Sequence, residues 1–165
     1  MVESTTQKSW LQWLAAGAVF AGTCDITYAA TYSYLRAGVA PSTVLRFVAS
    51  GALGKEALNG GAGTAALGLG FHYLNAFLIC AGLFFVASRF AGVRAAIARN
   101  TLVSGLGFGA FVYVAMTFGV VQLSRIGPRP APALPTWTSG LAVHMFLIGL
   151  PMVIAARRAF AEPAA

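Results

Sequence analysis

Three ionisable side chains stand inside long apolar segments of this sequence: Asp25, His72 and His144. Histidine changes its charge near neutral pH, and burial moves the titration of a carboxyl group toward the same range. Histidine and carboxylate also bind metal ions, and two histidines can hold a haem iron from both sides. These residue types therefore allow a proton or small-ligand site, a metal site, or a haem b site.

The chain that carries these residues is too apolar for a soluble protein. Of its 165 residues, 58% are hydrophobic and 9% are charged, and the mean hydropathy is +0.76. Soluble domains are about 25% charged. The composition therefore excludes a soluble enzyme, a disordered protein and a nucleic-acid-binding domain, although the net charge is +7. Its Lys and Arg residues occur singly between apolar blocks, as in integral membrane proteins.

Four segments are long enough to cross a bilayer as helices, which takes about 20 apolar residues. We predict these spans at about residues 10–35, 63–88, 101–123 and 137–156, within a single membrane domain covering 1–165. Pro41 suits the first turn of a helix, so residues 41–53 are predicted to form a short amphipathic or re-entrant helix. The fold class is an all-α membrane protein, a four-transmembrane-helix bundle with this short helix between the first two spans.

Small and polar residues share one face of each predicted span, which is typical of helix contacts in lipid. The faces therefore predict a bundle with these sides inward. Pro151 predicts a kink in the fourth span, because proline lacks the N–H that a helix interior needs. In chain order the four faces are Ala18, Gly22, Asp25 and Ala29; Ala65, Gly68, His72, Asn75 and Gly82; Gly105, Gly109 and Tyr113; and Gly140, His144 and Pro151.

The buried polar residues fall at similar depths. Counted from the outer ends of the spans at about 1.5 Å per residue, Asp25 lies about 15 Å deep, His72 about 13 Å and His144 about 10 Å. Tyr113 reaches the same level, and Asn75 lies one turn below His72. We therefore predict a buried polar cluster of these five residues.

Several interpretations of the cluster stay open. In a purely structural network, Asp25 accepts hydrogen bonds from His72, Tyr113 or Arg46. Arg46 is thus a candidate ion-pair partner of Asp25, or else its side chain extends to lipid phosphate. As a functional site, the cluster would handle protons or a small ligand. A metal ion or haem b at His72 and His144 is the remaining interpretation, although no local metal-binding spacing is present. No nucleophilic triad motif occurs either, so we expect no catalytic residues.

The basic residues predict the orientation of the chain. Six lie on the side that holds both termini and the Arg89–Arg99 loop, against five on the other side, and the six lie closer to span ends. This bias favours both termini in the cytoplasm and the bacterial inner membrane as the location. The six are Lys8, Arg89, Arg94, Arg99, Arg157 and Arg158.

Four segments together resemble small four-helix inner-membrane proteins of bacteria of unknown function, the YagU-like group. They are Gly22-x-x-Asp25, the segment Val48–Gly54, the entry into the second span from Gly61 to His72, and Gly149-Leu-Pro151. The resemblance implies an association with acid resistance, and it supplies no catalytic residues.

The leading hypothesis is a non-catalytic inner-membrane protein whose Asp25, His72 and His144 serve a proton-linked or small-ligand role in acid or envelope stress. One alternative is an accessory subunit that packs against a larger membrane complex. Another is a bis-histidine haem protein for electron transfer. The expected partners are the lipid bilayer and either further copies of the chain or a larger complex, with no nucleic acid.

Overall fold

The computed structural model describes the backbone of residues 3–161 and the side chains from residue 10 onward. Within that range every regular element is helical, as the composition predicts. η1 is a 3-10 helix, whereas η2 and η3 are π-helical turns. The elements are α1 (Glu3–Ala37), α2 (Pro41–Leu53), η1 (Lys55–Asn59), α3 (Ala62–Arg89), α4 (Ala91–Arg99), α5 (Thr101–Ala115), η2 (Met116–Val120), α6 (Val121–Leu123), α7 (Leu134–Val143), η3 (His144–Gly149) and α8 (Leu150–Ala159).

Three helical stretches are long and apolar enough to cross a membrane: Ala62–Arg89, Thr101–Leu123 and Leu134–Ala159. They correspond to the second, third and fourth predicted spans. α1 is longer, at 35 residues, but Asp25 and several Thr and Tyr residues make its second half more polar. By length and composition, residues 3–161 therefore contain three candidate spans, and α1 is not among them.

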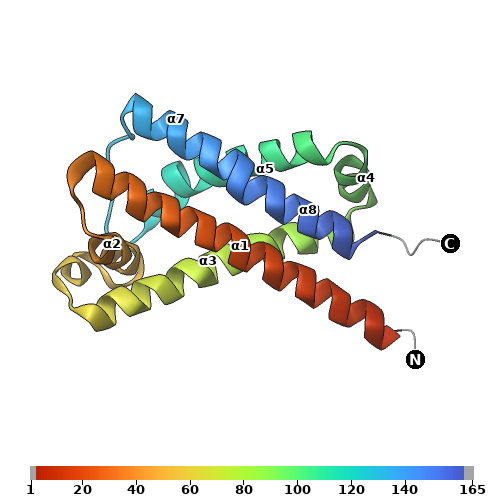
Figure 1. Ribbon diagram of the computed structural model, residues 1–165, viewed down its shortest axis with the longest axis horizontal. Coiled ribbons are helices and arrows are strands. Elements are labelled where there is room, and N and C mark those ends of the chain that lie inside the picture. The colour runs from red at the N-terminus through yellow and green to blue at the C-terminus, as the bar shows by residue number, and fades with distance from the viewer. Residues whose placement is uncertain (1–2, 162–165) are drawn as a thin grey trace.

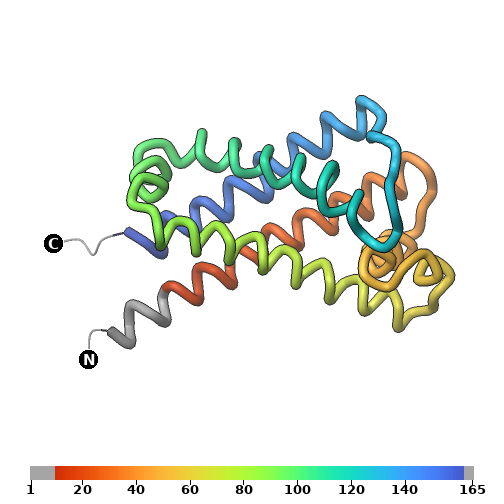
Figure 2. Tube along the Cα trace, turned by 180° about the vertical axis from the view of Figure 1, so that it is seen from behind, coloured from red at the N-terminus to blue at the C-terminus, as the bar shows by residue number. Residues whose placement is uncertain are grey.

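α1 is central to the packing. It contacts α3 along one side and α8 and η3 along another, while α5 packs against the far side of η3 and α8. In Figure 1, α8 ends at the same end of the molecule as α4, and α2 lies at the opposite end. Figure 2, from behind, shows α3 and α5 both on the near face. The core between α1, α3 and α8 contains Leu14, Ala18, Cys80, Phe84 and Met152.

Two tyrosines join α1 to α7 near the α2 end of the molecule. The hydroxyl of Tyr28 donates to Ser139 Oγ over 2.7 Å, and the hydroxyls of Tyr32 and Thr136 are 3.0 Å apart. In a membrane, side-chain hydrogen bonds of this kind help to hold helices together where the hydrophobic effect contributes little. These bonds therefore link the second half of α1 to the start of α7.

The short helix α2 begins at Pro41 and ends at Leu53, as predicted. It packs along α3 at Gly68, where an added methyl group would collide with the carbonyl of Leu45. The predicted Arg89–Arg99 loop, in contrast, is largely the helix α4. Its alanines favour helix, and its buried Ile97 packs into the core. The prediction of a loop was wrong because basic residues were used only to assign the sides of the membrane.

The helices α5 and α8 meet backbone to backbone through glycines. A methyl group on Gly105 would reach the Leu150 backbone, and one on Gly109 would collide with the His144 carbonyl. Gly149 faces the same contact from the other helix. The predicted small face of the third span is therefore a packing surface. On α3, however, Gly82 is exposed and touches no neighbouring helix, so its place on a packing face is wrong.

Candidate functional site

Four polar side chains from three elements line one small cavity inside the bundle. Asp25 from α1, His72 and Asn75 from α3, and His144 at the start of η3 border a cavity of about 70 Å³. The remaining wall is mainly apolar and includes Met116. The structure therefore brings together four of the five residues of the predicted cluster.

His72 is nearly buried, with 9% of its surface exposed, and its Nε2 lies 2.8 Å from the carbonyl oxygen of Gly22. Because a carbonyl oxygen only accepts hydrogen bonds, Nε2 carries the hydrogen, and the neutral ring keeps its lone pair on Nδ1. Gly22 permits this approach, since a methyl group there would press on Tyr73 and Ala76 at 3.1 Å. The bond thus fixes both the position and the tautomer of the ring.

His144 is fixed in the same way by its own helix. Its Nδ1 lies 2.9 Å from the carbonyl oxygen of Gly140, so Nδ1 donates and the lone pair of the neutral ring remains on Nε2. The ring of Tyr113 packs edge-on against this imidazole, with ring centroids 5.0 Å apart. Tyr113 in turn needs Gly140, because a methyl group there would lie 2.8 Å from the tyrosine ring. Tyr113 therefore supports His144 from behind.

Both π-helical turns begin at residues that line the cavity. η2 begins at Met116 and η3 begins at His144, on two helices that pack together through Gly109. A π turn inserts an extra residue into a helix and changes the direction of the side chains around it, and such turns are frequent at functional sites. Pro151 lies two residues after the end of η3, in the first turn of α8.

No family model, curated protein or solved structure matches this chain.

Asp25 lies one turn beyond Gly22 on α1 and is half-buried. Besides the 70 Å³ cavity, it borders a second cavity of about 400 Å³ that extends beneath α2. Within residues 10–161, its carboxylate has no hydrogen-bond donor and no ion-pair partner. The predicted structural network centred on Asp25 is therefore absent from this part of the chain, because His72 donates to Gly22 instead.

The structure does not bring Arg46 to Asp25. The guanidinium donates through Nη1 to the Gly60 carbonyl over 3.0 Å and through Nη2 to Thr43 Oγ1 over 2.8 Å. Arg46 therefore ties α2 to the turn before α3. The sequence interpretation of a pair with Asp25 failed because α2 lies along α3 with this side chain turned toward the Gly60 turn.

The cavity does not fit a haem between His72 and His144. Its volume of about 70 Å³ holds a few water molecules, whereas pockets for drug-sized ligands are about 300–1,000 Å³. Among the described residues, no three His, Cys, Asp or Glu side chains converge as a metal site.

Chemically, the cavity presents mainly hydrogen-bond acceptors. The Asp25 carboxylate, Nδ1 of His72 and Nε2 of His144 can each accept a hydrogen bond, and Asn75 can both donate and accept. A low-dielectric site with a surplus of acceptors is stabilised by a bound proton or another hydrogen-bond donor. The cavity therefore offers several acceptors to a hydrogen-bond donor.

Sequence reasoning missed Met116, which lines the cavity and accepts a hydrogen bond from Asn75 at 3.5 Å. Met116 follows Tyr113 by three residues and so lies on the same face of the third span. That spacing was a usable signal for Met116.

Proposed function

We propose that the protein is a multi-pass protein of the bacterial inner membrane in which α1 crosses the bilayer together with the three candidate spans. The support is that α1 is 35 residues long and packs along both α3 and α8. Five of the six basic residues predicted to face the cytoplasm lie at the α4 end or the end of α8. By the positive-inside rule, this distribution of basic residues supports a cytoplasmic location for both termini.

Within this membrane protein, Asp25, His72 and His144 form a proton-binding site. The observation that carries the proposal is the acceptor-rich cavity, in which both imidazoles are fixed with a lone pair remaining and the carboxylate is unpaired within residues 10–161. An ionised carboxylate in the middle of a membrane costs roughly 2.5–3.5 kcal/mol on insertion scales. Binding one proton removes that charge and supplies a donor for the neighbouring acceptors.

The size of the cavity favours protons over a larger ligand. A volume of about 70 Å³ accommodates water and a proton but no metabolite. The larger cavity beneath α2 is also lined by Asp25 and His72, together with residues of α2 and Ser124. Protons would therefore exchange with the α2 side of the membrane, which is the outer side in the proposed orientation. In the cell, the proposed proton site would serve in the response to acid.

The test is infrared difference spectroscopy of the reconstituted protein during a pH titration. We expect the wild type to show the band of a protonated carboxyl group that appears as the pH falls, and Asp25→Asn to lose it. Glu56→Gln is the matched control, because it removes an exposed carboxyl outside the spans. A pH-dependent band that Asp25→Asn retains and Glu56→Gln loses would overturn the proposal.

Proton movement is measured separately in vesicles with a trapped pH dye. If the site handles protons, Asp25→Asn and His72→Gln change the rate of acid equilibration or the pH range of the response, and Glu56→Gln leaves both unchanged. If the wild type and the three variants equilibrated acid at the same rate and over the same pH range, protonation of the cavity would have no effect on proton transport.

A further inference from the structure

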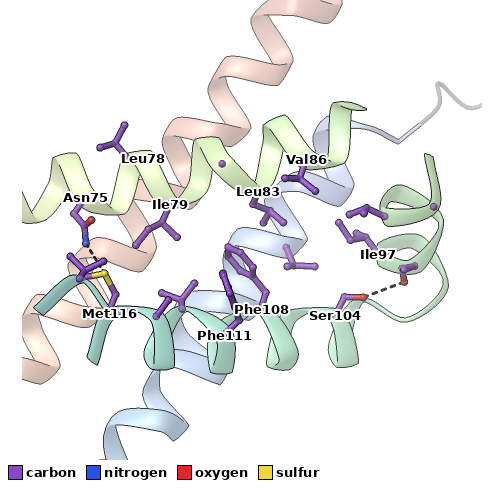
Figure 3. A pocket seen from close by; sticks show the side chains of 18 residues that line it. Asn75, Leu78, Ile79, Leu83, Val86, Ile97, Ser104, Phe108, Phe111 and Met116 are labelled. Carbon is purple, nitrogen blue, oxygen red and sulfur yellow. Dashed lines mark hydrogen bonds between the residues drawn. The ribbon is translucent and has the colours of Figure 1, made fainter. Parts of the chain in front are cut away.

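A long apolar groove runs between α3 and α5 and is closed at one end by α4. Its volume is about 720 Å³. Ile79 and Leu83 of α3 and Phe108 of α5 point into the space between the two helices (Figure 3). Along α3 the groove extends from Asn75 to Val86, which is about 16 Å at the rise of an α-helix. It is therefore far larger than the proton-binding cavity and differs from it in chemistry.

The groove ends at a polar contact that also borders the proton-binding cavity. Nδ2 of Asn75 donates to Sδ of Met116 over 3.5 Å, and both residues line the groove, the 70 Å³ cavity and the cavity beneath α2 (Figure 3). A thioether is a weak acceptor, and among the described residues the amide oxygen of Asn75 has no donor. The amide is thus available to a polar group that arrives along the groove.

The depth of this contact restricts the kind of ligand. Asn75 is the fourteenth of the 28 residues of α3, so it lies near the middle of the bilayer. A charged head at that depth costs roughly 2.5–3.5 kcal/mol, which keeps the heads of phospholipids and ionised fatty acids at the surface. A neutral head on a wholly apolar chain can lie at this depth. A neutral lipid is therefore the occupant that fits.

The hydrogen-bonding groups beyond Asn75 define the head. The proton-binding cavity offers acceptors, so the fitting head carries hydroxyl donors. Phe108 and Phe111 provide aromatic surface for a ring or an unsaturated chain. We propose that the groove binds a neutral isoprenoid lipid with a hydroxyl-bearing head, with the head at Asn75. Quinols and polyprenols share this chemistry, and the inference rests on the proposed proton site for the acceptors.

Gly82 allows the groove to be blocked without disturbing the fold. It lines the groove, and a Cβ added there would have no atom within 4 Å, so the side chain of Gly82→Leu starts in open space beside the groove. Gly70 is the matched control, because it is an exposed glycine on the same helix, with equally open space, outside the lining. Val86→Phe gives a second, independent block from a partly exposed position.

The experiment is native mass spectrometry and equilibrium binding of the purified full chain with four probes: decylubiquinol, decylubiquinone, a short polyprenol and phosphatidylglycerol. We expect the hydroxyl-bearing probes to bind, and decylubiquinol to bind about tenfold more tightly than its oxidised form, which lacks the donors. Gly82→Leu and Val86→Phe should weaken binding by about tenfold or more, while Gly70→Leu should bind like the wild type. Asn75→Leu should remove the preference for the reduced form.

Three results would overturn the inference. One is tightest binding of phosphatidylglycerol with the same sensitivity to Gly82→Leu, and another is binding that neither blocking variant weakens. The third is a dimer that Gly82→Leu dissociates without affecting lipid, which would identify a second copy of the chain as the occupant. The two proposals can be tested apart. Gly82→Leu should lose lipid binding and keep the Asp25 infrared band, because it changes the groove and not the proposed proton site.

Discussion

Gly109 on α5 packs directly against the backbone carbonyl of His144, the residue at which the π turn η3 begins. The glycine therefore does two things at once. It lets the two helices approach at backbone distance, and it sets the depth at which His144 reaches the cavity. Tyr113, one turn further along α5, then packs against the same imidazole. The histidine is thus positioned from the helix opposite as well as by its own bond to Gly140.

Replacing Gly109 with alanine should separate these helices. The added methyl group would collide with the His144 carbonyl and the Met145 backbone, which cannot move without shifting the helix. Overpacking of this kind costs about 1–3 kcal/mol. We expect a lower thermal unfolding temperature in detergent for Gly109→Ala. Gly107→Ala is the control, because its methyl group meets no atom within 4 Å, and it should unfold at or above the wild-type temperature. If Gly109→Ala and Gly107→Ala destabilised the protein equally, the close contact between Gly109 and the His144 backbone would be refuted.

The tyrosine bonds between α1 and α7 predict a second stability effect. Tyr28→Phe and Tyr32→Phe each remove a hydroxyl that bonds to Ser139 or Thr136. Side-chain hydrogen bonds between membrane helices average about 0.6 kcal/mol, so the double variant should lose roughly 1 kcal/mol. Tyr34→Phe removes an exposed hydroxyl, with 59% of that residue accessible, and should be neutral. Unfolding in a denaturing detergent series measures the stability of each variant. If Tyr34→Phe destabilised the protein as much as the double variant, the role given to the Tyr28 and Tyr32 hydrogen bonds would be refuted.

The helical pattern of the chain was accessible from hydropathy because spans depend on long apolar runs. The bounds of α2 followed from Pro41, and three of the predicted spans match helices of the required length and composition. α1 differs because Asp25 lowers its apolar character, while its packing depends on contacts with α3 and α8 that no local pattern encodes. The helix α4 was missed because only its charges were considered.

For the candidate site, counting depth along the spans predicted which residues meet, but not how they bond. Depth is a one-dimensional property. It placed Asp25, His72, His144 and Tyr113 at similar levels and Asn75 one turn below, but Tyr113 does not line the cavity. The partners depend on rotation and on close backbone approach. His72 reaches the Gly22 carbonyl because glycine leaves room there, and Arg46 turns to Gly60 because of the way α2 lies on α3. The groove between α3 and α5 likewise depends on how the two helices lie relative to each other, which a pattern along the sequence does not give.

The two cysteines should differ in reactivity. Cys80 is fully buried, with its Sγ 3.6 Å from the Leu14 carbonyl, whereas Cys24 is partly exposed on α1. A membrane-permeant maleimide should therefore label Cys24 faster than Cys80 in the folded protein. Peptide mass spectrometry after timed labelling measures the two rates, and labelling in denaturing detergent should make them equal. Faster modification of Cys80 would show that the core between α1, α3 and α8 opens.

Asp25 and Arg46 should act independently on stability, because the structure gives Arg46 other partners. Arg46→Met removes the bonds to Gly60 and Thr43 and should destabilise the α2 region by about 1–3 kcal/mol, as expected for bonds to a charged group. Asp25→Asn should change stability by a separate amount set by its burial in the cavity. If the two do not interact, the double variant equals the sum of the single changes within about 0.3–0.5 kcal/mol. Thermal unfolding of all four proteins closes this cycle. A coupling well above that range would mean that the two charges pair in the membrane, and the proton site would then lack its unpaired carboxylate.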